Sequence, residues 1–221
     1  LRVLKKIYQD LLSVIPHHPE VLGNLGTIEL HNGNQEVGIK YLEDSIKKNP
    51  QQPAFITNLA NGLLEIGRTN ESIKYFELAI SLNPRKTSEA YYNLGNALSE
   101  LKLWNDAIIN FDKAIALRND YSIAFNNRGV ALEEIGQLEE AVKSYEKSRN
   151  NNAHKVDYQL GLSQQIKMRL CDWDQLEVIQ VDLQAQVNEG RKVLPPLVPQ
   201  TLFDSVSLHR KAAEIYINDK Y

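Results

Sequence analysis

Residues 88–118 read SEAYYNLGNALSELKLWNDAIINFDKAIALR, and this stretch decides the fold. Its first half carries a small residue, Gly95, and its second half carries Ala107, Phe111 and Ala114 in a small–large–small order. The same residue types recur at equivalent positions along most of the chain. The equivalents of Gly95 follow one another at steps of 34, 35, 34 and 32 residues, and they are Gly26, Ala60, Gly95, Gly129 and Gly161. The sequence is therefore built from an internal repeat, which has to be interpreted before its secondary structure.

The second half of the repeat is as regular as the first. The counterparts of Ala107 are Gly38, Ser72 and Ala141, those of Phe111 are Leu42, Phe76 and Tyr145, and those of Ala114 are Ser45, Ala79 and Ser148. A period of 34 residues, with small side chains where two helices touch, resembles the tetratricopeptide repeat. The resemblance implies an all-α fold, a right-handed tetratricopeptide-repeat superhelix (α-solenoid) with a helical C-terminal extension.

Glycine marks the place where the first helix of each repeat has to stop. Gly33, Gly67 and Gly136 stand there, and glycine favours the left-handed conformation that ends a helix. Lys102 takes this place in the third repeat. We expect the turn at Lys102 to be slightly strained or differently built.

The repeat register divides the chain into two parts. We expect tetratricopeptide repeats over residues 1–170 and a helical connector over residues 171–221. The repeats comprise a half repeat (1–18), four full repeats (19–52, 53–86, 87–121 and 122–153) and the first helix of a fifth (154–170). In the connector, apolar spacing predicts a helix from about 176 to 190, an extended proline-containing segment, and a last helix capped by Asp204 or Ser205.

The first fifteen residues match the second helix of a repeat. Their apolar stripe consists of Leu4, Ile7, Leu11 and Leu12, and it expects a partner helix. The sequence therefore predicts a chain that begins in the middle of a repeat. We also expect self-association through exposed solenoid ends.

Composition excludes several classes of function. The chain has 221 residues, 43% of them hydrophobic and 24% charged, and a formal net charge of −3. This balance lacks the positive charge of a duplex nucleic-acid binder, and no apolar run is long enough to span a membrane. The single cysteine, Cys171, fits a reducing compartment, so we expect a cytoplasmic protein. Because Cys171 stands between Leu170 and Trp173, we expect its thiol to be buried.

Residues that carry catalysis are not found. The five histidines have no second ligand at metal-site spacing, and no phosphate loop, paired-carboxylate motif or nucleophile elbow occurs. We expect no catalytic residues, no metal site and no cofactor in this chain, and solvated histidines on its surface.

Asparagine is unusually frequent and falls in register. The sixth position of successive repeats holds Asn24, Asn58, Asn93 and Asn127, and the fifth repeat keeps an amide at Gln159. One turn further on, the ninth position holds Thr27, Asn61, Asn96 and Val130. Residues three apart share a helix face, and in tetratricopeptide solenoids this face lines the concave groove. The sequence predicts a ladder of amides along that groove.

An amide has two donors and an acceptor with two lone pairs, so it can bond the main chain of an extended peptide whatever its side chains. We therefore expect Asn24, Asn58, Asn61, Asn93, Asn96, Asn127 and Gln159 to bind extended or disordered polypeptide. The alternative is that these amides only bond neighbouring helices. No lysine or arginine stands at the second or fifth positions of the four full repeats, which argues against a clamp for a C-terminal carboxylate.

The C-terminal part resembles a particular family. The residues that carry the resemblance are Tyr158-Gln-Leu-Gly-Leu, then Cys171-Asp-Trp-Asp, then Arg191-Lys-Val-Leu-Pro-Pro, and finally Leu208-His-Arg-Lys-Ala-Ala-Glu-Ile-Tyr. They are similar to the segment that joins the repeats to the catalytic region in O-linked N-acetylglucosaminyltransferases, including SPINDLY-type bacterial relatives. The family's asparagine ladder matches Asn24, Asn58, Asn93 and Asn127, and Gln159 departs from it.

The resemblance implies a role in substrate recognition. In this family the nucleotide-sugar pocket and the catalytic residues lie beyond the connector, so the present chain is expected to be inert and to hold acceptor polypeptide for a glycosyltransferase. The alternative is a stand-alone scaffold or adaptor whose groove binds one dedicated protein partner.

Overall fold

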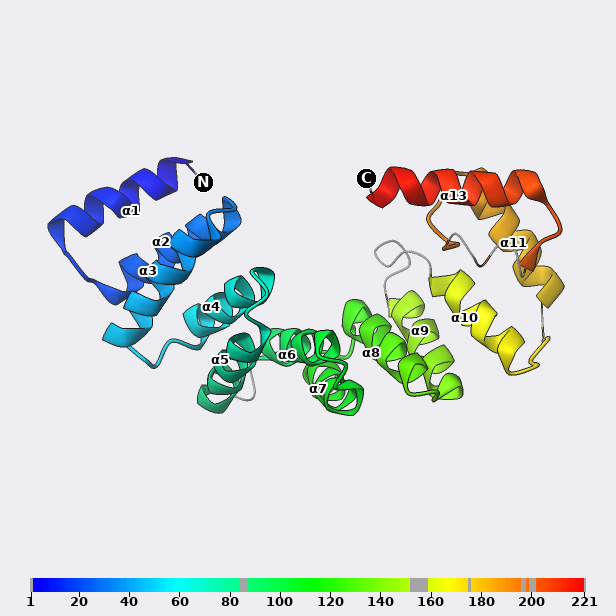
Figure 1. Ribbon diagram of the computed structural model, residues 1–221, viewed down its shortest axis with the longest axis horizontal. Coiled ribbons are helices and arrows are strands. Elements are labelled where there is room, and N and C mark those ends of the chain that lie inside the picture. Colours follow the sequence, from blue (N-terminus) through cyan, green and yellow to red (C-terminus); the bar gives the residue numbers. More distant parts are fainter. Residues whose placement is uncertain are drawn as a thin grey trace. The chain divides into compact units, whose positions relative to one another are not determined.

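The computed structural model describes residues 2–83, 87–151, 159–174, 176–195, 198 and 202–220, and these form helices joined by turns and loops, with no strand among them (Figure 1). The prediction of an all-α solenoid is confirmed. The helices are α1 (Arg2–Val14), α2 (Pro19–His31), α3 (Gln35–Lys48), α4 (Pro53–Glu65), α5 (Thr69–Leu82), α6 (Ser88–Glu100), α7 (Trp104–Leu117), α8 (Ser122–Glu134), α9 (Leu138–Asn151), α10 (Gln159–Arg169), α11 (Leu176–Asn188) and α13 (Val206–Lys220).

The chain forms two compact units, Leu1–Leu117 and Arg118–Tyr221. The first unit contains α1 to α7, and the second contains α8 to α13. The border between the units lies between the end of α7 and the start of α8.

In the first unit, consecutive helices pack in pairs, with small residues at the contacts. α2 packs on α3, α4 on α5 and α6 on α7. A Cβ atom added to Gly26 would lie 2.6 Å from Leu42, and one added to Gly95 would lie 2.5 Å from Phe111. Leu42 and Phe111 are fully buried at these contacts. The small residues thus let the two helices of a pair approach closely around a large side chain.

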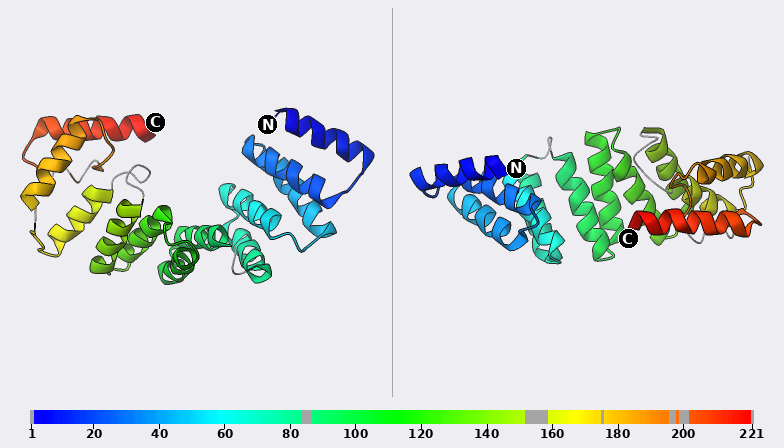
Figure 2. Two further views of the ribbon diagram at one scale, coloured as in Figure 1. Left: turned by 180° about the vertical axis from the view of Figure 1, so that it is seen from behind. Right: turned by 90° about the horizontal axis from the view of Figure 1, so that it is seen from above.

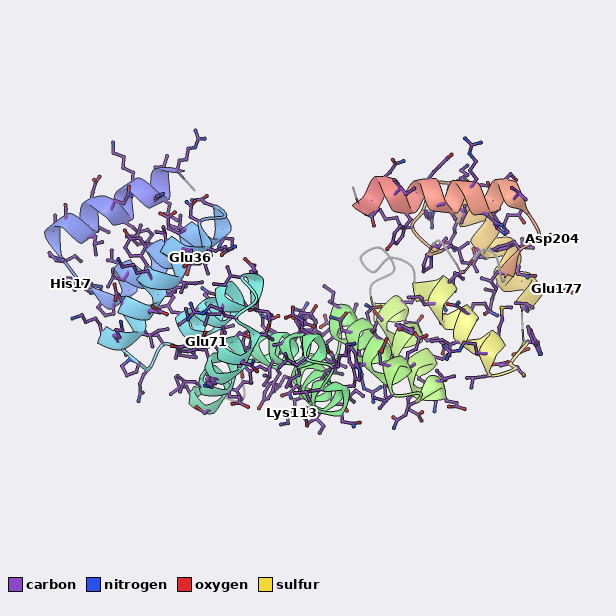
Figure 3. All side chains as sticks on the ribbon, in the orientation of Figure 1. His17, Glu36, Glu71, Lys113, Glu177 and Asp204 are labelled. Atoms are coloured by element: carbon purple, nitrogen blue, oxygen red, sulfur yellow. The ribbon has the colours of Figure 1, made fainter. Side chains whose placement is uncertain are left out.

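Successive pairs of the first unit place their first helices side by side. α2 contacts α4, and α4 contacts α6, so these three helices form one face of the unit (Figures 1 and 2). The second helices of the pairs, α3 and α5, bear the residues Glu36 and Glu71 that are labelled in Figure 3. We refer to the surface of α2, α4 and α6 that carries the asparagines as the amide face.

The first helix of each described pair ends in the same hydrogen-bonded turn. After α4, the N–H of Gly67 donates to the carbonyl of Leu64 and that of Arg68 to the carbonyl of Leu63. Lys102 makes the equivalent bond to Ser99 after α6, at φ 58° against 76° for Gly67. The third turn is therefore built like the others, and the strain falls on the left-handed backbone of Lys102.

Helix α1 lies on α2 through a polar contact and leaves its apolar stripe open. The Nζ of Lys5 lies 2.7 Å from the Oε1 of Glu29, whose side chain is buried. Leu4, Ile7 and Leu11 remain 45%, 49% and 40% exposed. These three residues of the stripe are therefore open to solvent, whereas the fourth, Leu12, is half-buried.

The second unit begins with a regular pair, α8 and α9, in which Gly129 faces Tyr145. Helix α10 packs on α9, but a second helix does not cover Gly161. Instead, the N–H of Gly161 donates to the carbonyl of Val193, and Leu194 of the extended connector lies over it, only 2% exposed. The connector thus occupies the place where other repeats put a helix.

The remaining C-terminal elements follow the predicted order. Leu183 and Val187 of α11 form an apolar cluster with Leu194, Leu208 and Ala212. At the start of α13 the N–H of Leu208 lies 3.4 Å from the Oγ of Ser205, so Ser205 is the cap. Residues 152–158, on which part of the fifth repeat's predicted first helix falls, lie outside the described residues.

The prediction that Cys171 is buried is wrong. Its thiol is exposed, because Cys171 has φ 57° in the turn that ends α10. Its N–H donates to the carbonyl of Met168, and that of Asp172 donates to the carbonyl of Lys167. Sequence suggested burial from apolar neighbours, whereas the turn geometry directs this residue outward.

Candidate functional site

The amide face brings five of the predicted residues onto three neighbouring helices. Asn24 lies on α2, while the other four lie on α4 (Asn58, Asn61) and α6 (Asn93, Asn96). All five are half-buried at the surface. Asn127 lies on α8 of the second unit and is also half-buried, and the side chain of Gln159 lies outside the described part of the structure.

Two of these amides link neighbouring helices. The Nδ2 of Asn58 donates to the Oγ1 of Thr27 on α2, at 2.9 Å. The Nδ2 of Asn93 donates to the Oδ1 of Asn61 on α4, at 2.8 Å. In both cases the sixth position of one repeat bonds the ninth position of the repeat before it. The alternative that the asparagines bond adjacent helices therefore holds for Asn58 and Asn93.

These bonds use one end of each amide and leave the other end open. Within the described residues nothing donates to the Oδ1 of Asn58 or of Asn93, and nothing accepts from the Nδ2 of Asn61. None of these three atoms is sealed from solvent. The face therefore offers an acceptor at the sixth position and a donor one helical turn further along α4. Asn96 and Asn127 take part in other interactions.

Two hollows flank Asn58. One lies between α2 and α4, has a volume of about 160 Å³, and is lined by Thr27, Leu30, His31, Asn58, Asn61, Gly62 and Glu65. We refer to it as the α2–α4 hollow. The other lies between the N-terminal halves of α4 and α6, has about 280 Å³, and is lined by Pro53, Ala54, Thr57, Asn58, Asn83, Thr87, Glu89 and Ala90. Asn58 is thus the amide best placed to contact a ligand.

The hollows contain polar groups that the sequence reasoning missed. His31 and Glu65 both stand at the thirteenth position of their repeats, two turns beyond the sixth-position asparagine. The Nδ1 of His31 lies 2.7 Å from the carbonyl of Thr27, and Glu65 accepts a hydrogen bond from Gln35 on α3. The sequence could have placed His31 and Glu65 near the asparagines, because residues seven apart share a helix face.

Other kinds of site are not seen in the described residues. No group of three or more His, Cys, Asp or Glu side chains there is arranged to hold a metal ion. No helix among those described is long and apolar enough to cross a membrane.

Comparison with known protein families finds repeats in the middle of the chain. Two family patterns, both described as tetratricopeptide repeat, match residues 57–122 and 123–148. The chain contains tetratricopeptide repeats. These repeats coincide with α4 to α9, whose small-residue contacts and turns are described above. None of the curated proteins matches the chain.

Several solved structures share this fold. A crystal structure of MamA is 24% identical, covers 68% of this chain and 88% of its own, and has a TM-score of 0.64. MamA from Desulfovibrio magneticus RS-1 is 16% identical over 77% of this chain and 96% of its own, at TM-score 0.69. YrrB, a tetratricopeptide protein with an unusual peptide-binding site, is 13% identical over 94% of this chain and 97% of its own, at TM-score 0.66. At these identities the likeness extends to the fold alone.

Proposed function

We propose that the amide face binds an extended polypeptide segment through hydrogen bonds to its main chain. The observation that carries this proposal is the open acceptor of Asn58 beside the open donor of Asn61. In an extended chain, the N–H and C=O of one residue point to the same side, as in a strand pair. One residue of the ligand can then donate to Asn58 and accept from Asn61.

The hydrogen bonds between helices support this function as well as the fold. Because Thr27 holds the Nδ2 of Asn58, the amide cannot rotate freely and its Oδ1 keeps one direction. A group fixed before binding loses less conformational entropy when the ligand arrives. The asparagines can therefore link neighbouring helices and also bind a ligand. The ligand would use the amide atoms that make no bond between helices.

The broader assignment is a non-catalytic solenoid that binds proteins or peptides. Within it, we propose the narrower role of substrate recognition for a glycosyltransferase similar to the O-linked N-acetylglucosaminyltransferases, in a cytoplasmic setting. The sequence around Cys171 and the proline-containing connector support this role. So does the packing of Leu194 on Gly161, which ends the helix pairs at α10. The alternative is a stand-alone scaffold for one protein partner. A two-lobed transferase domain encoded after Tyr221 in the parent gene would favour the narrower role, and a stop codon there would favour the scaffold.

The test uses an array of 15-residue peptides of varied sequence, followed by fluorescence anisotropy with the peptides that bind. The triple variant Asn58→Ala, Asn61→Ala, Asn93→Ala is expected to keep its helical circular dichroism. Its affinity is expected to fall by about tenfold or more, because a lost hydrogen bond costs roughly 0.5–1.5 kcal/mol. Unchanged affinity would contradict the proposal.

Two controls separate binding from folding. The variant Asn70→Ala, Asn105→Ala, Asn188→Ala removes three exposed asparagines away from the amide face, and it should bind like the wild type. Thr27→Val removes the partner of Asn58 but leaves the Oδ1 of that amide in place. Because Thr27 orients Asn58, Thr27→Val should weaken peptide binding, but less than Asn58→Ala does. Equal losses would show that Asn58 acts only through its bond to Thr27.

A further inference from the structure

The α2–α4 hollow has a chemical character that main-chain binding does not require. Its polar lining comes from Thr27, His31, Asn58, Asn61 and Glu65, and its apolar lining from Leu30 and Gly62. The hydrogen bonds already made in the structure determine which of these groups remain able to donate and which remain able to accept.

His31 presents an acceptor to the hollow. Its Nδ1 lies 2.7 Å from the carbonyl oxygen of Thr27, and a carbonyl can only accept. The Nδ1 therefore carries the hydrogen, so the Nε2 of the neutral ring has a free lone pair. The hydroxyl of Thr27 is also committed, since it donates to the carbonyl of Gly23.

Glu65 and Asn58 add further acceptors. Gln35 donates to the Oε2 of Glu65, which leaves the Oε1 open, and no described lysine or arginine forms an ion pair with this carboxylate. The Nδ2 of Asn58 is held by Thr27, so this amide offers its oxygen. Because the oxygen of Asn58 and the Nδ2 of Asn61 are assigned to the main chain of the ligand, a side chain in the hollow meets two acceptors, the Nε2 of His31 and the Oε1 of Glu65, and no open donor among the described lining side chains.

A cationic group that only donates fits this lining. The ammonium of lysine has three donors and no acceptor, and the guanidinium of arginine has five. The negative charge of Glu65 is uncompensated by any described lining residue. Leu30 and the bare backbone of Gly62 provide contact for the methylene stem that such a side chain carries. A carboxylate or phosphate would instead face the negative charge of Glu65 and the lone pair of His31.

We propose that the α2–α4 hollow binds a lysine or arginine side chain of the extended polypeptide, with Glu65 and His31 as the residues that select it. This inference rests on the proposed function of the amide face. Asn58 and Asn61 would hold the main chain at the rim, and alternate side chains of an extended segment point to the same side. One side chain of the bound segment then enters the hollow.

The test starts from one peptide that binds in the array. Each of its positions is replaced in turn by lysine, arginine, norleucine or glutamate, and the affinity of each resulting peptide is measured. At one position the wild type is expected to prefer lysine or arginine to norleucine by at least about fivefold, as expected for a hydrogen-bonded charge pair. This preference should shrink as salt is raised, because the hollow is open to solvent. Equal affinity for lysine and norleucine at every position, or a preference for glutamate, overturns the inference.

Glu65→Gln is the diagnostic variant, because it removes the charge and keeps the size of the side chain. It should abolish most of the preference for lysine, so that the lysine and norleucine peptides bind the variant with similar affinity. Glu77→Gln, an equal change of charge on an exposed residue of α5, should have no effect. If Glu65→Gln and Glu77→Gln behave alike, Glu65 does not select the side chain.

The results distinguish this inference from the function on which it rests. If the triple asparagine variant binds as the wild type does, main-chain binding by the amide face fails. If that variant loses binding while the four peptides bind the wild type equally, main-chain binding stands and only the cation preference fails.

Discussion

At the scale of single residues, the eleventh position of the repeat is buried, and one repeat has a charged residue there. Leu63, Leu98 and Leu132 occupy this position in three repeats and are buried. Glu29 occupies it in the first repeat and is 3% exposed. A buried carboxylate needs hydrogen bonds, and Glu29 receives them from Lys5 on α1 and from Asn34 after α2, both at 2.7 Å.

Lys5→Met is expected to destabilise the protein by about 1–3 kcal/mol at neutral pH, because it leaves the buried Glu29 without its charged donor. Burial by itself raises the pKa of Glu29, but the hydrogen bonds from Lys5 and Asn34 and the charge of Lys5 bring the pKa below its ordinary 4.5. The stabilisation is thus fully present above 4.5 and is lost as the pH falls through the lowered pKa.

Urea unfolding of wild type and Lys5→Met at several pH values measures this effect. The difference between them should be large at neutral pH and should shrink in acid below 4.5. Lys6→Met, which changes an exposed lysine of the same helix, should be close to neutral at all pH values. If the two variants behave alike, the contact between Lys5 and Glu29 does not hold α1 on α2.

At the scale of elements, helix ends and helix partners decide where each repeat begins and stops. The turns after α2, α4 and α8 place Gly33, Gly67 and Gly136 in the left-handed region, where glycine has no Cβ clash. The turn after α6 places Lys102 there at a steric cost. Near the C-terminus, Leu194 of the connector replaces the second helix of a pair, so the pattern of alternating helices stops at α10.

Lys102→Gly is expected to stabilise the protein by about 0.5–1 kcal/mol. The relief of left-handed strain, about 1–2 kcal/mol, exceeds the entropy that glycine adds to the unfolded chain. Urea unfolding measures the gain. Lys102→Ala also removes the lysine side chain but keeps the Cβ, so it should give no such gain. Equal effects of glycine and alanine would show that the strain is absent.

At the scale of the whole molecule, the apolar stripe of α1 is the feature that a single chain leaves unsatisfied. Leu4, Ile7 and Leu11 lie at exposed positions of a strongly amphipathic helix. Contiguous apolar surface of this kind is a site of association.

The protein is therefore expected to self-associate through α1 as its concentration rises, which sedimentation velocity can follow. Leu4→Gln, Ile7→Gln, Leu11→Gln should shift the protein towards monomer. Val178→Gln, Val181→Gln, which alters two exposed apolar residues of α11, should leave the association unchanged. A wild type that stays monomeric at every concentration would contradict the expectation.

The sequence by itself determined the repeat and therefore most of the fold. Small residues such as Gly95, large ones such as Phe111 and turn residues such as Gly67 act within one helix or one tight turn. Their effects depend on short separations along the chain, so a 34-residue register was enough to place helices, pairs and turns. The same register put five asparagines on the amide face of α2, α4 and α6.

Only the tertiary structure decided what that face can bind. The partners of Asn58 and Asn93 lie 31 and 32 residues away, and the side-chain conformations of two packed helices determine them. These bonds direct the open atoms of each amide, and the packing of α2 against α4 brings His31 and Glu65 into one hollow. The contact of Leu194 with Gly161 is likewise set by packing, because an extended segment fills a space that local periodicity assigns to a helix.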